Sequence, residues 1–156
     1  MRFRAWLRVG LVLLALHEGV PAAWAGLLPE SFYAGFPGGG HAWVAAFPPY
    51  NEHLVRDFGM AMLQVVAVLL FAAAFLEHRL VQAALIGSLL FNVPHLVFHQ
   101  DHLVPSENVA VQLASLMAPI VVALVLLWLN HRIRTCALHA PSPVFFGGGE
   151  RKRSPD

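Results

Sequence analysis

Three histidines stand close together in the segment "NVPHLVFHQDH" at residues 92–102. His95, His99 and His102 have the spacing i, i+4, i+7, so on a helix they would share one face. Neutral imidazole is a common protein ligand for transition metals, and two histidines one helical turn apart can reach one ion. The same groups can act as acid and base or hydrogen-bond a small polar ligand. These residue types therefore favour a metal, ligand or acid–base site.

Polar residues with helical spacing recur in two neighbouring segments. One stripe contains His53, Asp57 and Gln64, and a second contains Asn108, Gln112 and Ser115. A charge at the centre of a bilayer costs roughly 2.5–3.5 kcal/mol on insertion scales, so polar groups turn toward other helices or a watery cavity. We therefore expect the stripes to face each other.

The predicted ligand pocket draws on these stripes and on the first apolar segment. It comprises Asn92, His95, His99, His53, Asp57, Gln64, Gln112 and Glu18. The hypothetical metal ligands, for a transition-metal ion or haem iron, are His95, His99, Asp57, His53 and His102. Two other interpretations stay open. In the first, the chain is a structural or accessory subunit, and its polar stripes do no more than hydrogen-bond neighbouring helices, at about 0.6 kcal/mol per contact. In the second, the chain is a membrane enzyme that uses histidine as acid and base.

The composition indicates how these residues are positioned. Of 156 residues, 58% are hydrophobic and 12% are charged, against roughly 25% charged in soluble domains. A membrane-spanning helix needs about 20 mostly apolar residues, and four stretches qualify, at about 7–28, 57–76, 80–100 and 108–130. Because the last three are joined by short links, the sequence predicts an all-α, four-helix, up-and-down transmembrane bundle.

The arginines predict the orientation, because basic residues are retained on the cytoplasmic side. Nearly all of them fall on one side, which places both termini in the cytoplasm and the protein in the plasma (inner) membrane. Arg56, on the other side, is expected to pair with Glu52 or to snorkel. The net charge of +1 gives no case for nucleic-acid binding. A second possibility is that the first span is a signal peptide cleaved near "AWAG" at 23–26.

Two segments lie outside the spans. Residues 29–54 are rich in aromatic residues, glycine and proline, which predicts either an ordered extracytoplasmic cap between the first two helices or a flexible loop. Residues 1–134 form the predicted transmembrane domain, and 135–156 a disordered cytoplasmic tail. The expected partners are the lipid bilayer, a small-molecule or lipid ligand, and a homo-oligomer or larger membrane complex.

The segments "FPPYNEHLVRDFG" at 47–59 and "VPHLVFHQDHL" at 93–103 resemble those of a group of small four-helix membrane proteins of actinobacterial type, similar to DoxX proteins in size and topology. The resemblance implies a four-span integral membrane protein. It carries over no activity, substrate or cofactor. His53, Arg56, Asp57, His95 and His99 lie inside the matching segments without an implied role.

Overall fold

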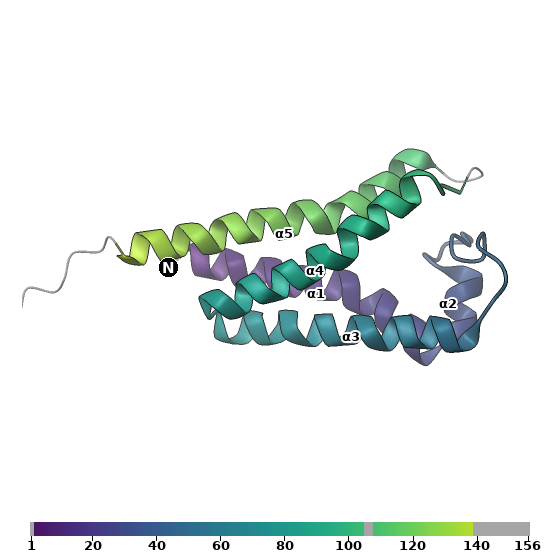
Figure 1. Cartoon of the computed structure of the whole chain (residues 1–156), viewed down its shortest axis with the longest axis horizontal. Coiled ribbons are helices and arrows are strands. Elements are labelled where there is room, and N and C mark those ends of the chain that lie inside the picture. Colours follow the sequence, from purple (N-terminus) through teal and green to yellow (C-terminus); the bar gives the residue numbers. More distant parts are fainter. Residues whose placement is uncertain (1, 105–107, 139–156) are drawn as a thin grey trace, which may run out of the picture.

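The computed structural model describes residues 2–104 and 108–138, with side chains through residue 135. This part of the chain is all-helical and contains no strand. Its helices are α1 (Arg2–Leu27), α2 (Pro29–Gly35), α3 (Glu52–Phe75), α4 (His78–Gln100) and α5 (Val109–Leu138) (Figure 1). Within these residues, α1, α3, α4 and α5 are each long and apolar enough to cross a membrane. The predicted all-α bundle of four long helices is confirmed.

The helices extend beyond the predicted spans. α1 begins at Arg2, α3 begins at Glu52, and α5 continues to Leu138, into the predicted tail. An apolar run marks only the part of a helix that needs hydrocarbon around it. Backbone hydrogen bonds carry the helix further, as far as a capping residue or a turn allows. The rest of the predicted tail, residues 139–156, lies outside the described residues.

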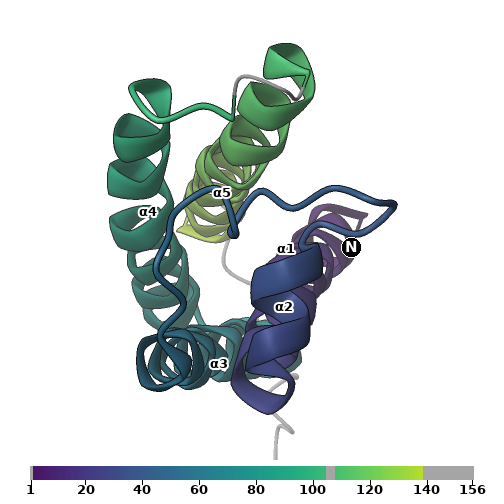
Figure 2. The same cartoon turned by 90° about the vertical axis from the view of Figure 1, so that its right-hand side faces the viewer.

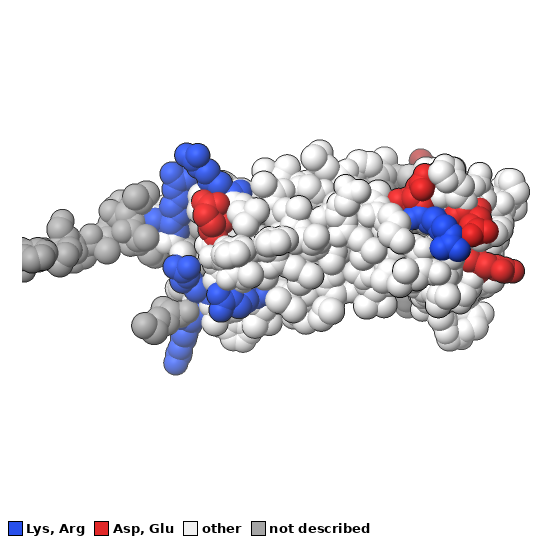
Figure 3. Space-filling model, turned by 90° about the horizontal axis from the view of Figure 1, so that it is seen from below, with Lys and Arg blue, Asp and Glu red and all other residues white. Residues whose placement is uncertain are grey.

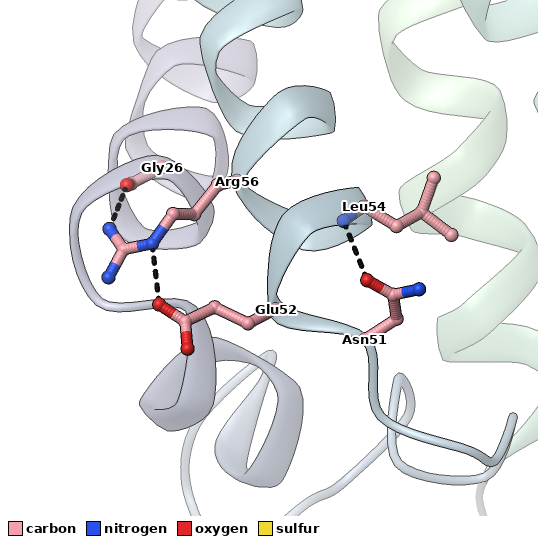
Figure 4. Close-up of polar contacts among 5 residues, drawn as sticks. All are labelled: Gly26, Asn51, Glu52, Leu54 and Arg56. Atoms are coloured by element: carbon pink, nitrogen blue, oxygen red, sulfur yellow. Dashed lines mark hydrogen bonds and ion pairs between the residues drawn. The ribbon is translucent and has the colours of Figure 1, made fainter.

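Side chains at the helix starts satisfy backbone N–H groups that have no partner inside the helix. The side-chain oxygen of Asn51 accepts from the Leu54 N–H at 3.1 Å (Figure 4). The Glu77 carboxylate accepts from the N–H groups of Arg79 and Leu80, at 3.1 and 2.7 Å. Leu76 adopts a left-handed conformation with φ of 50°, so α3 ends and α4 begins within two residues.

The four long helices form a square. α1 packs on α3 and α5, and α4 packs on the same two helices, so α1 and α4 occupy opposite corners (Figure 2). Leucine, alanine and valine side chains fill the centre, among them Leu11, Leu69, Val81 and Leu85. Many large apolar side chains face outward, including Leu90, Phe75 and Trp128. Such a surface is costly in water and suits a bilayer.

α1 and α3 approach each other closely because small residues line their contact. A Cβ atom added at Gly59 would lie 2.6 Å from the Ala22 oxygen and 2.7 Å from the Gly26 Cα. Those atoms belong to backbone and cannot rotate away. Small residues that allow this approach are a common basis of helix association in membranes.

Each helix of the α1–α3 pair supplies an arginine to the other helix's last turn. Arg8 on α1 donates to the Ala73 carbonyl at 3.0 Å. Arg56 on α3 donates to the Gly26 carbonyl at 3.0 Å and to Glu52 at 2.8 Å (Figure 4). The predicted Arg56–Glu52 pair is confirmed. Because helix C-terminal carbonyls lack intrahelical partners and carry partial negative charge, these contacts stabilise both ends of the antiparallel pair.

Charged side chains gather at the two ends of the bundle. Figure 3 shows basic groups clustered at one end, acidic groups mostly at the other, and a band without charge between them on this face. The start of α1, the start of α4 and the end of α5 carry the first group, and we call them the arginine-rich end. The opposite end, where α2 lies, is the α2 end. This asymmetry agrees with the arginine pattern from which the orientation is predicted.

Substituting Gly59 with alanine tests the close α1–α3 contact. The new methyl group meets backbone atoms of Ala22 and Gly26, so we expect a loss of about 1–3 kcal/mol in the free energy of unfolding. Denaturation in detergent, followed by circular dichroism, measures this loss. Gly87→Ala is the matched control, because no atom lies within 4 Å of the added Cβ. Equal losses in both variants would contradict the packing argument.

The cap at Glu77 predicts an acid-dependent stability. Hydrogen bonds from the backbone N–H groups of Arg79 and Leu80 lower the pKa of Glu77 from its ordinary value of 4.5. A lowered folded-state pKa contributes stability that is present above pH 4.5 and is lost as the pH falls through the folded value. Glu77→Gln should therefore lose less stability between neutral and acid pH than the parent does. Denaturation midpoints of the parent, Glu77→Gln and the exposed control variant Glu30→Gln are measured across this pH range. The same pH dependence in the parent and Glu77→Gln would show that the cap is unimportant.

Candidate functional site

A carboxyl group lies at the centre of the bundle. Glu18 is on α1, about 15 Å along the helix axis from Arg8, and only 6% of its surface is exposed. Its neighbour His17 is exposed instead. Glu18 is the only buried acidic residue in the described part of the chain. Ionisable groups inside a membrane domain are costly, so their default interpretation is functional.

Two side chains of α4, at the opposite corner of the square, donate to one oxygen of this carboxyl group. The Ser88 hydroxyl donates to Glu18 Oε1 at 2.5 Å, and the Asn92 amide donates to the same atom at 2.8 Å. The amide of Asn92 also donates to the Ser88 carbonyl at 2.9 Å, which fixes its position on α4. We call Glu18, Ser88 and Asn92 the Glu18 centre. It links helices whose backbones do not touch.

The second oxygen of the carboxyl group is unsatisfied. Glu18 Oε2 is buried and has no hydrogen-bond partner among the described residues. A buried polar atom without a partner costs about 1–3 kcal/mol, and more if it is charged. Such an atom in a folded protein calls for an explanation, such as a proton, a water molecule or a ligand. The centre therefore has one open position for a hydrogen-bonding or charged group.

The histidines of α4 lie beyond Asn92, toward the α2 end. The rings of His95 and His99 are 4.6 Å apart, edge to face. Phe91 stacks on His95 at 5.0 Å, and Phe47, from the segment between α2 and α3, meets His99 at 5.6 Å. His102 is exposed and stacks on Phe98 at 4.2 Å. The helical spacing thus brings His95 and His99 together, in an aromatic environment.

The hypothetical metal ligands do not form one group. His53 Nε2 lies 3.2 Å from Asp57 Oδ2, and both side chains are more than half exposed. Within the described residues, no three His, Cys, Asp or Glu side chains are arranged to hold a metal ion. His53 and Asp57 form one pair on α3, and His95 and His99 a second pair on α4. Transition-metal or haem binding stays a prediction without support from these contacts.

The two glutamines of the predicted pocket have separate environments. Gln112 is buried, and its side chain makes two hydrogen bonds with the backbone of Val104. Its amide oxygen accepts from the Val104 N–H at 2.9 Å, and its amide nitrogen donates to the Val104 carbonyl at 3.1 Å. It therefore fastens the segment after α4 to α5. Gln64 is exposed and lines a shallow apolar groove with residues such as Val68 and Gly87. Neither glutamine contributes a hydrogen bond to the Glu18 centre.

Of the predicted pocket residues, Glu18 and Asn92 are hydrogen-bonded to each other, whereas Ser88, which also donates to Glu18, is not among the predicted residues. A signal for Ser88 exists, because it precedes Asn92 by one helical turn and extends the stripe of Asn92, His95 and His99 inward. A single serine within an apolar run is a weaker indication of a functional site than the nearby histidines are. No known protein-family model, curated protein or solved structure matches the chain.

The hydrogen bonds of Asn92 predict a measurable contribution to stability. Asn92→Ala removes one of the two donors to Glu18 Oε1, so we expect a loss of about 0.6–1.7 kcal/mol in the free energy of unfolding, as for other polar contacts in membranes. Denaturation in detergent measures it. Gln82→Ala on the same helix is the control, because the Gln82 side chain is exposed. An Asn92→Ala variant as stable as this control would show that the contact is unimportant.

Proposed function

We propose that this integral membrane protein binds a small proton-donating or cationic ligand, in the simplest case a proton, at the Glu18 centre. The observation that carries the proposal is the buried, unpartnered Oε2 atom of Glu18. The predicted small-ligand pocket is thereby centred on Glu18 and Asn92, deeper in the bundle than the histidines. Its membrane is proposed to be the plasma (inner) membrane, with the arginine-rich end in the cytoplasm.

The charge balance of the site supports this choice of ligand. Both donors act on Oε1 and both are neutral, one hydroxyl and one amide. No arginine or histidine pairs with Glu18 in the described structure, where the ion pairs are His53–Asp57 and Arg56–Glu52. A carboxylate in a low-dielectric interior needs neutralisation. A proton or a cationic group at Oε2 supplies it.

The imidazoles of α4 give the proposal a route to the surface. His95 follows Asn92 by one turn, and His99 follows His95 by another, with ring centroids 4.6 Å apart. A neutral imidazole has one donor and one acceptor nitrogen, and chains of carboxyl and imidazole groups are typical of proton paths in membranes. In this proposal His95 and His99 pass protons between the α2 end and Glu18.

The competing function is that of a structural or accessory subunit. In that case the Glu18 centre only holds α1 against α4, and the carboxyl group has no chemical part. Gln is a close structural substitute for Glu, because its carbonyl oxygen can accept the same hydrogen bonds from Ser88 and Asn92. Glu18→Gln therefore separates the two functions, since it keeps the contact and removes the acid.

Infrared spectroscopy of the protein in lipid, recorded through a pH titration, tests the proposal directly. We expect a carboxyl C=O band from a group that hydrogen-bonds through one oxygen, and we expect Glu18→Gln to remove it while the protein stays folded. Ser88→Ala should shift the band, because it removes the donor at 2.5 Å. Glu30→Gln, which changes an exposed carboxyl group, should leave it unchanged.

The infrared titration and a measurement of denaturation temperature can together contradict the proposal. A Glu18→Gln protein with an unchanged carboxyl spectrum would mean that Glu18 does not exchange protons within the accessible pH range. If, in addition, amines and monovalent cations did not raise the denaturation temperature of the parent relative to Glu18→Gln, the site would bind no cation. The structural function would then stand.

A further inference from the structure

A cavity lies at the arginine-rich end, and none of its lining residues belongs to the Glu18 centre. It has a volume of about 180 Å³ and is lined by residues of α1, α4 and α5 and by Leu76 from the turn between α3 and α4. Whole small-molecule sites usually measure about 300–1,000 Å³. The cavity is therefore of a size for a headgroup or a small ion and not for a whole lipid.

Two arginines make the lining of this cavity basic. Arg4 comes from α1 and Arg134 from α5, so two different helices supply a basic residue to the same lining. Both side chains are exposed, and no carboxylate pairs with either of them among the described residues. By contrast, Arg8 is engaged at the end of α3, and Arg132 lies over the ring of Trp128. Arg4 and Arg134 are therefore available to an anion.

A third group in the lining lacks a partner. His78 Nδ1 is buried and makes no hydrogen bond in the described structure. The backbone carbonyl of His78 accepts from the buried Asn130 amide at 3.1 Å, which fixes the start of α4 against α5. The imidazole can place an N–H on Nδ1. The two guanidinium groups of the lining suit the oxygens of a phosphate group.

The rest of the lining favours a phosphate that belongs to a lipid. Leu7, Leu76 and Ile133 form the apolar wall, and the neighbouring outer surfaces of the helices carry exposed apolar side chains such as Phe3 and Phe75. A free phosphate ion gains nothing from such surroundings, whereas a phospholipid places its acyl chains along them. Basic pockets between transmembrane helices on the cytoplasmic side are suited to anionic headgroups.

We propose that the cavity between Arg4, Arg134 and His78 is a binding site for the phosphate of an anionic phospholipid. The lipid would join the start of α1 to the end of α5. This inference does not depend on the function proposed for Glu18, because the two sites share no residue.

Lipid titration of the complete protein in a neutral detergent, followed by native mass spectrometry, tests the site. The probes are short-chain phosphatidylglycerol, phosphatidylcholine of the same chain length, and inorganic phosphate. Each basic group near an anionic lipid contributes roughly fivefold in affinity, so Arg4→Gln/Arg134→Gln should bind phosphatidylglycerol about thirtyfold more weakly than the parent. Phosphatidylcholine should bind the parent more weakly than phosphatidylglycerol does.

A double variant with the same change in charge provides the control. Arg79→Gln/Arg132→Gln removes two arginines at the same end that do not line the cavity, and it should bind phosphatidylglycerol as the parent does. An equal loss in both double variants would overturn the site, because the attraction would then be general. Equal binding of the two lipids by the parent would also overturn it. Displacement of phosphatidylglycerol by an equal concentration of inorganic phosphate would identify a free phosphate site and overturn the lipid assignment.

Discussion

The interior of a bilayer offers no water, so every polar group placed there needs a partner within the protein. The four long helices satisfy their own backbone groups, and side chains complete the ends. Asn51 and Glu77 accept from the first N–H groups of α3 and α4. Arg8 and Arg56 donate to the last carbonyl groups of the neighbouring helix. In this setting, the unpartnered oxygen of Glu18 is an exception that needs an explanation of its own.

The Glu18 centre lies where two helix pairs meet. α1 and α3 form one pair, which packs closely at its glycines and is joined by the arginine contacts between the two helices. α4 and α5 form the other pair. Glu18 reaches from the first pair to Ser88 and Asn92 on the second. A change in its protonation or ligand would change hydrogen bonds that join the pairs. In the proposed function, proton or cation binding at this atom would therefore bear on how the two halves pack together.

The sequence predicted the spans and their connections, because apolar composition and link length decide both. It also predicted Arg56–Glu52, a contact within one helix. It could not predict how stripes on different helices face one another. Helical spacing fixes a common face but not the rotation of that face about the axis, so His53 and Asp57 turned outward while Asn92 turned inward. Gln112 found its partner in nearby backbone, which spacing does not reveal.

The two pairs are held together differently along their length. Figure 1 shows the two pairs separating toward the α2 end. There the ring of Phe47, from the segment between α2 and α3, contacts the ring of His99 on α4. Hydrogen bonds to Glu18 join the two pairs at the centre. At the arginine-rich end, Asn130 ties α5 to the start of α4, and the basic cavity lies between α1 and α5. A lipid phosphate there would close the end at which like charges of α1 and α5 repel. In the proposed function, a proton or cation would reach Glu18 from the side of the histidines, where the two pairs diverge.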